Sequence, residues 1–501
     1  MFYSKSRQLL IGAFITFIAL SCFAIEDQQS SYGQTDFYAT GDAKAQVVFK
    51  KGLLQLHNFE FKDARQSFKQ TLEIDPDFAM AWWGEALSHW HPLWPYNDVD
   101  GGRAVLQRMG DSPAQRTAMG KTERERAYLA SIEYLFADGD LLTRRHAYSD
   151  ALKALSEKYP DDLDAAAFYA LSILAKSNGR KYHYYMQAGA VTEEILDRNP
   201  LHPGALHYNI HSYDDTIHAP LGLRAARDYY KVAPSAVHAL HMGAHIYYAT
   251  GKWELGLDRN IDSFDEAVAR MPDPNGRYDP EGYHSLAWIP YGFQQIGDTT
   301  NALIYLDLLA DQARRFPEHP VMPMGRMHFI EARASYIVDT QDWESDLLDQ
   351  DVSHEKLPPY YVATDNYIKG LVALKKGEVK TAKSYLEKMG NPPMPKSGPR
   401  TKLGPALLKL ALAGQISLVE GDKEDGLELL QKAAEIDLDW PSEAGPVKPV
   451  QPMVELLAQT YHRLGDFEKA RKYYELTELY SVGRALTKHG LKELDSISTL
   501  D

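Results

Sequence analysis

The sequence predicts an all-α solenoid, in which antiparallel helix pairs stack side by side and curve around a concave groove. Two observations support this fold class. Small residues and prolines recur with a period of about 34 residues, and short glycine-containing turns separate amphipathic segments of helical length. At 501 residues the chain is also too long for a single compact core, as expected for an elongated array of repeats.

The first repeat lies in the segment FKKGLLQLHNFEFKDARQSFKQTLEIDP. It places Ala64, Phe68 and Pro76 at offsets of 12, 16 and 24 residues from Gly52. These residues and spacings resemble the tetratricopeptide repeat, a pair of helices that cross closely at small residues and end at a proline. The pattern returns at Ala170, Ala188 and Pro200, at Gly222, Ala226 and Pro234, and at Ala244 with Gly256, Gly370 with Ala382, Gly414 with Gly426, and Ala458 with Ala470.

The resemblance predicts a tetratricopeptide-type solenoid over residues 44–390 and C-terminal repeat pairs with a capping helix over residues 401–501. Turns such as ATGKW, QIGDT and RLGDF mark the corners within the pairs. Two insertions, near residues 91–121 and 271–283, interrupt the array and are expected as irregular segments at the rim of the groove. Proline-rich stretches at residues 391–400 and 441–452 are expected as linkers between late repeats.

The N-terminus has the features of an export signal over residues 1–24. Lys5 and Arg7 precede the apolar run LLIGAFITFIALSCF, which is too short for a membrane span. Cys22 and Ala24 fit ordinary signal peptidase cleavage, and the alternative is a lipoprotein signal with Cys22 lipidated. The sequence thus predicts an exported protein, periplasmic or associated with the cell envelope, whose membrane contact would be a lipid anchor at Cys22.

The net charge limits the classes of partner that the protein could bind, and the single cysteine limits the residues that could ligate a metal. The formal net charge of -15 argues against binding to nucleic acid or to anionic membrane surfaces. Cys22 is the only cysteine, so a mature exported chain would carry no disulfide framework and no catalytic thiol. Any metal site must therefore use His, Asp, Glu or Tyr.

Histidines recur in phase with the repeat. His241 and His245 stand 34 residues after His207 and His211, at the same two positions of successive first helices. Residues at such spacings lie on one side of a helix, and the resemblance implies that this side lines the groove. The other candidates on this side are His238, His284 and His328 near the helix starts, and Asp214 and Tyr248 near the ends.

Two His-x-x-x-His pairs on neighbouring helices can chelate metal, because imidazoles one turn apart project the same way. The predicted ligands are His207, His211, His241 and His245, with Asp214 as a further ligand or as an acceptor that orients an imidazole. One or two ions of Zn, Cu, Fe or Mn would suit these donors. The sequence has no HExxH motif, which removes the usual zinc-peptidase interpretation. A metal-free polar groove, and histidines that only hydrogen-bond neighbouring helices, stay open as alternatives.

A second candidate surface lies in the stretch AMAWWGEALSHWHPLWPY. It places Trp83 and Trp90 on the expected groove side, with Glu85 and His89 nearby. Flat aromatic faces can stack on a sugar ring or a peptide side chain, although tryptophans in such repeats more often belong to the core. Glu85 or His238 would serve as a base if a metal drove a reaction. The candidate groove residues are Trp83, Glu85, His89, Trp90, His238, Tyr248, His284 and His328.

The start of the chain is similar to a group of exported bacterial tetratricopeptide proteins, on the text GLLQLHNFEF and on AMAWWGEA followed by HPLW. The stretch HALHMGAH is similar to a histidine-rich motif of the same group. That motif has Met-Pro-Ser where this chain has Met242, Gly243 and Ala244. The departure removes a hydroxyl and a helix-kinking proline, and the resemblance implies no particular activity.

The sequence favours a non-enzymatic binding or scaffold protein of the cell envelope. It carries no glycine-rich phosphate loop, no GxSxG elbow and no zinc-ribbon spacing. Its groove would take a protein segment or a glycan in an accessory role. The alternative is a metal carrier, or a metal-dependent hydrolase or oxidase, that uses the histidine-rich groove.

Overall fold

The computed structural model describes residues 31–93, 97–273, 275–318, 322–443 and 445–498. Within these ranges the chain forms helices and no strand, which confirms the predicted fold class. The expected export signal over residues 1–24, including Cys22, lies outside the described residues.

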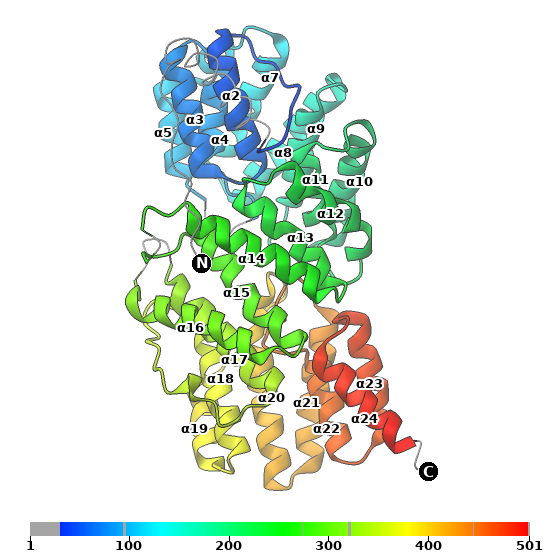
Figure 1. Ribbon diagram of the computed structural model, residues 1–501. Coiled ribbons are helices and arrows are strands. Elements are labelled where there is room, and N and C mark those ends of the chain that lie inside the picture. The colour runs from blue at the N-terminus through cyan, green and yellow to red at the C-terminus, as the bar shows by residue number, and fades with distance from the viewer. Residues whose placement is uncertain (1–30, 94–96, 274, 319–321, 444, 499–501) are drawn as a thin grey trace, which may run out of the picture.

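The helices follow one another as antiparallel neighbours along the whole array (Figure 1). The first group comprises α2 (Ala43–His57), α3 (Phe61–Ile74), α4 (Ala79–Leu87), α5 (Val99–Met109), α6 (Pro113–Ala118), α7 (Glu123–Phe136) and α8 (Leu141–Lys158). The middle group comprises α9 (Leu163–Leu174), α10 (Tyr182–Arg198), α11 (Pro203–Tyr213), η1 (Ala219–Gly222), α12 (Leu223–Val232), α13 (Val237–Ala249), α14 (Trp253–Ala269), α15 (Pro280–Gln295) and α16 (Thr299–Arg315). The last group comprises α17 (Met324–Thr340), η2 (Asp346–Leu348), α18 (Pro359–Lys375), α19 (Val379–Lys388), α20 (Arg400–Glu420), α21 (Lys423–Asp439), α22 (Met453–Arg463), α23 (Phe467–Tyr480) and α24 (Ala485–Ser498).

The repeat positions explain how the pairs pack. A Cβ on Gly52 would lie 2.9 Å from the ring of Phe68, so a glycine lets α2 and α3 cross at this separation. The turns between paired helices use glycines with positive φ, a conformation that other residues rarely adopt. These glycines are Gly251, Gly297, Gly377, Gly421 and Gly465. They stand at the corners that the sequence predicts.

The insertion near residues 91–121 is helical, although it was expected to be irregular. Asp98 caps α5 by accepting the N–H of Gly101, and Ser112 caps α6 in the same way. Thr122 and Glu125 then form a capping box that starts α7. Strong caps allow these short helices to form between the repeat helices. The repeat pattern could not predict them, because the twelve-residue spacing of small residues marks only the paired helices.

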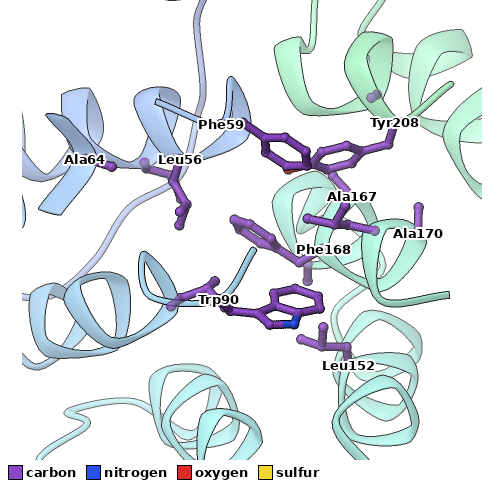
Figure 2. Packing of buried hydrophobic residues seen from close by; sticks show 14 of the residues in the cluster. Leu56, Phe59, Ala64, Trp90, Leu152, Ala167, Phe168, Ala170 and Tyr208 are labelled. Atoms are coloured by element: carbon purple, nitrogen blue, oxygen red, sulfur yellow. The ribbon is translucent and has the colours of Figure 1, made fainter. Parts of the chain in front are cut away.

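Two large apolar clusters form the core, and they divide close to residue 250. The first runs from Phe37 to Ala249 and the second from Leu257 to Leu494. Figure 2 shows part of the first, where the Trp90 ring lies among side chains from several helices. The loose division expected between residues 390 and 401 falls in the loop between α19 and α20, and α18 and α20 pack directly against each other across this loop.

The proline-rich segments expected as linkers connect α19 to α20 and α21 to α22, and both also contact the middle of the array. At Gly179 a Cβ would lie 2.7 Å from the backbone of Gly398, so the two turns are in close contact. The hydroxyl oxygens of Thr216 and Ser442 are 3.0 Å apart, and these residues are 226 positions apart in the sequence. Both contacts join the C-terminal segments to the middle of the array and cover the groove.

The C-terminal end of the array also returns to its middle (Figure 1). The Trp253 Nε1 donates to the carbonyl oxygen of Gly483 at 2.9 Å, and the Ala485 backbone N–H donates to Gln295 Oε1 at 3.0 Å. These bonds attach the start of α24 to α14 and α15. The array is therefore curled rather than open-ended.

Among the described residues, α20 alone combines a length and an apolar composition that would allow it to cross a membrane. Of its most apolar stretch, 61% is buried inside the protein. Such burial is typical of a helix in the core of a folded protein.

Candidate metal centre

The covered groove is a cavity of about 1450 Å³. Its walls carry four predicted histidines, His211, His245, His284 and His328. The ring of Trp288 belongs to the same lining, and the C-terminal segment lies directly on it, since a Cβ at Gly445 would be 2.4 Å from that ring.

The first three-histidine set, called the first triad, joins His207 and His211 of α11 to His238 of α13. One ring nitrogen from each lies within 4.8 Å of the other two. The Nε2 atoms of His207 and His238 are 3.1 Å apart. Two ligands of a tetrahedral ion with bonds of about 2.0 Å stand about 3.3 Å apart, so this pair already has the spacing of coordinating nitrogens.

The second triad joins His241 and His245 of α13 to His284 of α15, and its ring nitrogens also lie within 4.8 Å of one another. The Nε2 atoms of His241 and His245 are 3.0 Å apart. The ring centroids of His211 and His245, one from each triad, are 5.7 Å apart. The two histidine rows therefore face the same space, as their repeat phase predicts.

Oxygen atoms face the Nδ1 atoms on the other side of these rings. In the first triad, His207 Nδ1 is 2.7 Å from the carbonyl oxygen of His57, and His238 Nδ1 is 3.0 Å from Glu281 Oε2. In the second, His241 Nδ1 is 2.6 Å from Asn260 Oδ1. Asp214 Oδ2 serves both triads, at 3.2 Å from His211 Nδ1 and 3.1 Å from His245 Nδ1. Histidines that bind metals through one nitrogen typically hold the other nitrogen in this way.

These partners determine which ring nitrogens have a free lone pair. A carbonyl oxygen and an ionised carboxylate only accept hydrogen bonds, so the Nδ1 atoms of His207, His211 and His245 carry the proton. In the neutral rings the Nε2 atoms then bear lone pairs directed away from those partners. The Nε2 of His211 is buried and has no hydrogen-bond partner. Such buried acceptors are costly unless a donor or a cation meets them.

Asp214 holds one ring from each triad. The Arg180 guanidinium donates to its other carboxylate oxygen and also to Asp215 Oδ2 at 2.8 Å. Burial alone would raise the pKa of Asp214, but Arg180 and the Nδ1–H donors of His211 and His245 keep that pKa well below its usual range. The carboxylate is thus permanently charged. Because its Oδ2 already accepts from both rings, Asp214 orients imidazoles, which is one of the two roles that the sequence allows.

Burial keeps the imidazoles neutral. It lowers the pKa of His211 to about 4 and that of His238 to about 3, and it holds the pKa values of His207, His241 and His284 well below their usual range. A metal competes with protons for an imidazole. These rings would therefore be ready to bind a cation at neutral pH without first losing a proton.

The low pKa of His211 makes a prediction for the metal-free protein. The unfolded chain takes up a proton near pH 6.5 and the folded chain only near pH 4, so the contribution of His211 to stability is complete above pH 6.5 and declines as the pH falls towards 4. Relative to His211→Gln, the wild-type protein should lose about 2 kcal/mol of unfolding free energy between pH 7 and pH 5. Urea unfolding of both proteins at the two pH values would measure this loss. A difference that does not change with pH would contradict the burial of this ring.

Four of the predicted groove residues lie elsewhere. Trp83 is fully buried between the rings of Tyr128 and Phe168, and Trp90 packs edge-on against Tyr148. The prediction of a stacking surface for a sugar or peptide on Trp83 and Trp90 is therefore wrong. Side-chain periodicity predicts which residues share a side of the helix, but not what packs against that side. In the first group of helices this side packs into the core.

The acidic and imidazole groups beside these tryptophans form local ion pairs. Glu85 is buried and accepts from Arg108 at 2.8 Å, while His89 Nδ1 is 2.6 Å from Asp98 Oδ2. Neither residue lines the large cavity, so Glu85 is not placed to act as a base for the centre. Tyr248 is buried behind the second triad, where its hydroxyl donates to the Trp288 carbonyl oxygen at 3.2 Å.

His328 lines the cavity without belonging to a triad. Its Nδ1 is 3.8 Å from Glu331 Oε2, and Lys448 Nζ is 3.9 Å from Glu331 Oε1. Burial raises the pKa of Glu331 and lowers that of His328 to about 4. This part of the wall therefore offers a polar surface close to the histidines.

His57, His202 and Asp164 form another buried group with metal-like spacing. His202 Nδ1 accepts the backbone N–H of Ala205, so its Nε2 carries the proton and is directed at Asp164 Oδ1, 3.6 Å away. His57 bonds Asp164 at 2.9 Å and Tyr208 at 3.0 Å. Both ring nitrogens of His57 have hydrogen-bond partners, whereas His202 Nε2 makes only the longer contact with Asp164. This group is a polar network of the core that supports the carbonyl facing His207.

Sequence reasoning missed the side chains that orient the triads. Asn260 comes from the second helix of its pair, Glu281 from the first turn of α15 and Arg180 from the turn before α10. None of them shares the phase of the histidine rows. A buried-residue pattern could have indicated Asn260, since a polar residue on an apolar helix face needs a partner.

Comparisons with known proteins place part of the chain in a family. Residues 453–476, in α22 and α23, match the model of the tetratricopeptide repeat. No curated protein sequence matches the chain.

The chain is also similar to several solved structures. The APC/C hetero-tetramer Cut9–Hcn1 has 14% identity and a TM-score of 0.38, over 95% of this chain and 82% of that one. Yeast Tom70 has 13% identity and a TM-score of 0.36, over 91% and 96%. The human IFIT1 dimer with m7Gppp-AAAA has 11% identity and a TM-score of 0.37, over 93% and 94%.

The architecture agrees with the family match. Arrays of this kind are interaction scaffolds that use an extended concave surface for binding. Residues 453–476 thus match the tetratricopeptide repeat, and the helix pairs and glycine corners of the other described residues have the architecture that such repeats form.

Proposed function

We propose that this protein binds a borderline transition metal, such as Zn or Cu, through the histidines of α11, α13 and α15. One observation carries the proposal: buried Nε2 atoms converge at spacings of 3.0 and 3.1 Å while side-chain and backbone oxygen atoms face the opposite Nδ1 atoms. The Nε2 atoms of His207, His211 and His245 bear lone pairs because their Nδ1 atoms donate to oxygen, and the Nε2 of His211 has no hydrogen-bond partner. A cation bound between them would satisfy several buried acceptors at once.

The position of the centre suggests how a bound metal would be used. His211, His245 and His284 are both triad members and part of the cavity lining. Three protein ligands and a position open to a cavity are typical of metal sites that bind an exchangeable ligand, whereas structural sites are closed by four. The metal would therefore meet whatever molecule enters the cavity.

We further propose that the cavity receives a protein segment or a glycan, in the cell envelope to which the predicted export signal would direct the chain. The supporting observation is the cavity wall, where the aromatic faces of Trp288, Tyr360 and Tyr361 lie beside the polar groups of Glu331 and Lys448. Such mixed surfaces bind peptides and sugars. Detection of the mature chain in a periplasmic or envelope fraction would test the localisation, and retention in the cytoplasm would contradict it.

Metal analysis of tag-free protein tests the central proposal. Wild-type protein, dialysed after exposure to Zn²⁺ or Cu²⁺, should retain metal in a whole-number ratio to the chain. The double variant His241→Ala/His245→Ala should lose half or more of that metal, because the 3.0 Å Nε2 pair is removed.

The double variant His183→Ala/His489→Ala is the matched control, because both side chains are exposed and lie outside the triads. It should retain the wild-type metal content. Metal-free wild-type protein after this treatment, or equal loss from both double variants, would contradict the proposal.

A further inference from the structure

We propose that the centre holds two metal ions, one in each triad, with His238 and His284 as the third ligands; this inference rests on the proposed metal-binding function. The sequence indicates four histidine ligands and leaves open whether they share one ion. The structure groups six histidines into two sets that have no member in common. Zn and Cu sites are usually completed by four ligands, so one ion cannot use all six nitrogens.

A single shared ion between the rows would need a different geometry. His211, Asp214 and His245 also lie within 4.8 Å of one another, and they are the group that would hold such an ion. The atoms that meet there are the two Nδ1 atoms and Asp214 Oδ2, at 3.2 and 3.1 Å. Those distances are hydrogen bonds in which Nδ1–H donates to the carboxylate. The contact therefore orients the rings and leaves each Nε2 for its own triad.

Each triad has its own set of orienting groups. In the first, the His57 carbonyl oxygen and Glu281 face His207 and His238 at 2.7 and 3.0 Å. In the second, Asn260 faces His241 at 2.6 Å. Asp214 is shared, because it holds His211 for the first triad and His245 for the second. Two sets of three imidazoles, each with orienting groups of its own besides the shared Asp214, are the arrangement expected for two binding sites.

The donor set narrows the class of metal. All six ligand atoms would be imidazole nitrogens, and the nearby oxygen atoms are occupied by Nδ1 groups. Imidazole favours Zn and Cu, whereas Mn, Mg and Ca prefer carboxylate, carbonyl and water oxygens. Of the four metals that the sequence allows, the triads therefore fit Zn and Cu best and Mn worst. Copper should bind more tightly than zinc, as the usual order of divalent affinities requires.

Native mass spectrometry and metal titration count the ions directly, with Zn²⁺ and Cu²⁺ as the probes. The wild-type chain should take up two equivalents of either ion, and Mn²⁺ should bind at least tenfold more weakly. His238→Gln should remove the first site and His284→Gln the second, so that each variant binds one equivalent. The combined variant should bind none.

Thermal unfolding of the metal-free proteins serves as the control for folding, and His284 is suited to replacement because it is partly exposed to the cavity. One equivalent bound by the wild type would overturn the two-ion inference and leave the proposed function intact. No metal bound by the wild type would overturn both. Loss of all metal from His284→Gln, in a variant that unfolds like the wild type, would also show a single shared site.

Discussion

Replacing Asp214 by asparagine is expected to weaken Zn²⁺ binding about 10- to 100-fold at both triads, a loss typical for groups that orient metal ligands. The Asp214 carboxylate accepts from Nδ1 of His211 and of His245 through one oxygen. An asparagine side chain is a neutral, weaker acceptor, and its amide nitrogen can only donate. If that nitrogen faces a ring, the proton moves to Nε2, the atom that must bind the metal.

Competition with a chromophoric chelator would measure this loss. Asp98→Asn is the matched control, since Asp98 meets His89 Nδ1 at 2.6 Å in a similar pair that lies outside the triads. That variant should keep wild-type affinity. An Asp214→Asn protein that binds Zn²⁺ within twofold of the wild type would show that this carboxylate does not orient the ligands.

Replacing Arg484 by methionine is expected to cost about 3–5 kcal/mol of unfolding free energy. Arg484 is almost fully buried at the start of α24, where it donates to Glu455 Oε2 at 2.9 Å, to the Tyr291 hydroxyl at 2.8 Å and to Asp339. Methionine fills similar space but leaves two buried carboxylates without their cation. Removing one partner of a buried ion pair costs far more than the pair contributes.

Urea unfolding at neutral pH would measure the effect. Arg471→Met is the control, because Arg471 pairs with Asp495 at 2.6 Å on the surface of the same C-terminal region, and exposed pairs contribute about 1 kcal/mol or less. Equal destabilisation by both variants would contradict the attachment of α24 to the middle of the array. A larger loss from Arg484→Met confirms that this attachment holds the curled array together.

The sequence predicted the fold and the convergence of the histidines because both follow from one period. His207 and His241 stand 34 residues apart, and a repeat that places one of them on the inner side places the other there as well. The glycine corners followed from local backbone chemistry, since Gly297 and Gly465 adopt a positive φ that other residues avoid.

Contacts between distant segments could not be predicted in the same way. The stretch that contains Ser442 and Gly445 has no helical period, so nothing in it indicates contact with Thr216 or Trp288. The prediction that Trp83 lines the groove was wrong for a related reason. A helix face that lines the groove in one repeat packs against additional helices in another. The side chains that orient the imidazoles, such as Glu281, depend on the same long-range packing.

The most direct test of two triads facing one space is anomalous diffraction from crystals soaked with Zn²⁺ or Cu²⁺. Two peaks are expected between α11, α13 and α15, one within about 2.0–2.1 Å of the Nε2 atoms of His207, His211 and His238, and one equally close to those of His241, His245 and His284. Peaks at other positions, or a single peak on Asp214 between the two rows, would contradict the account.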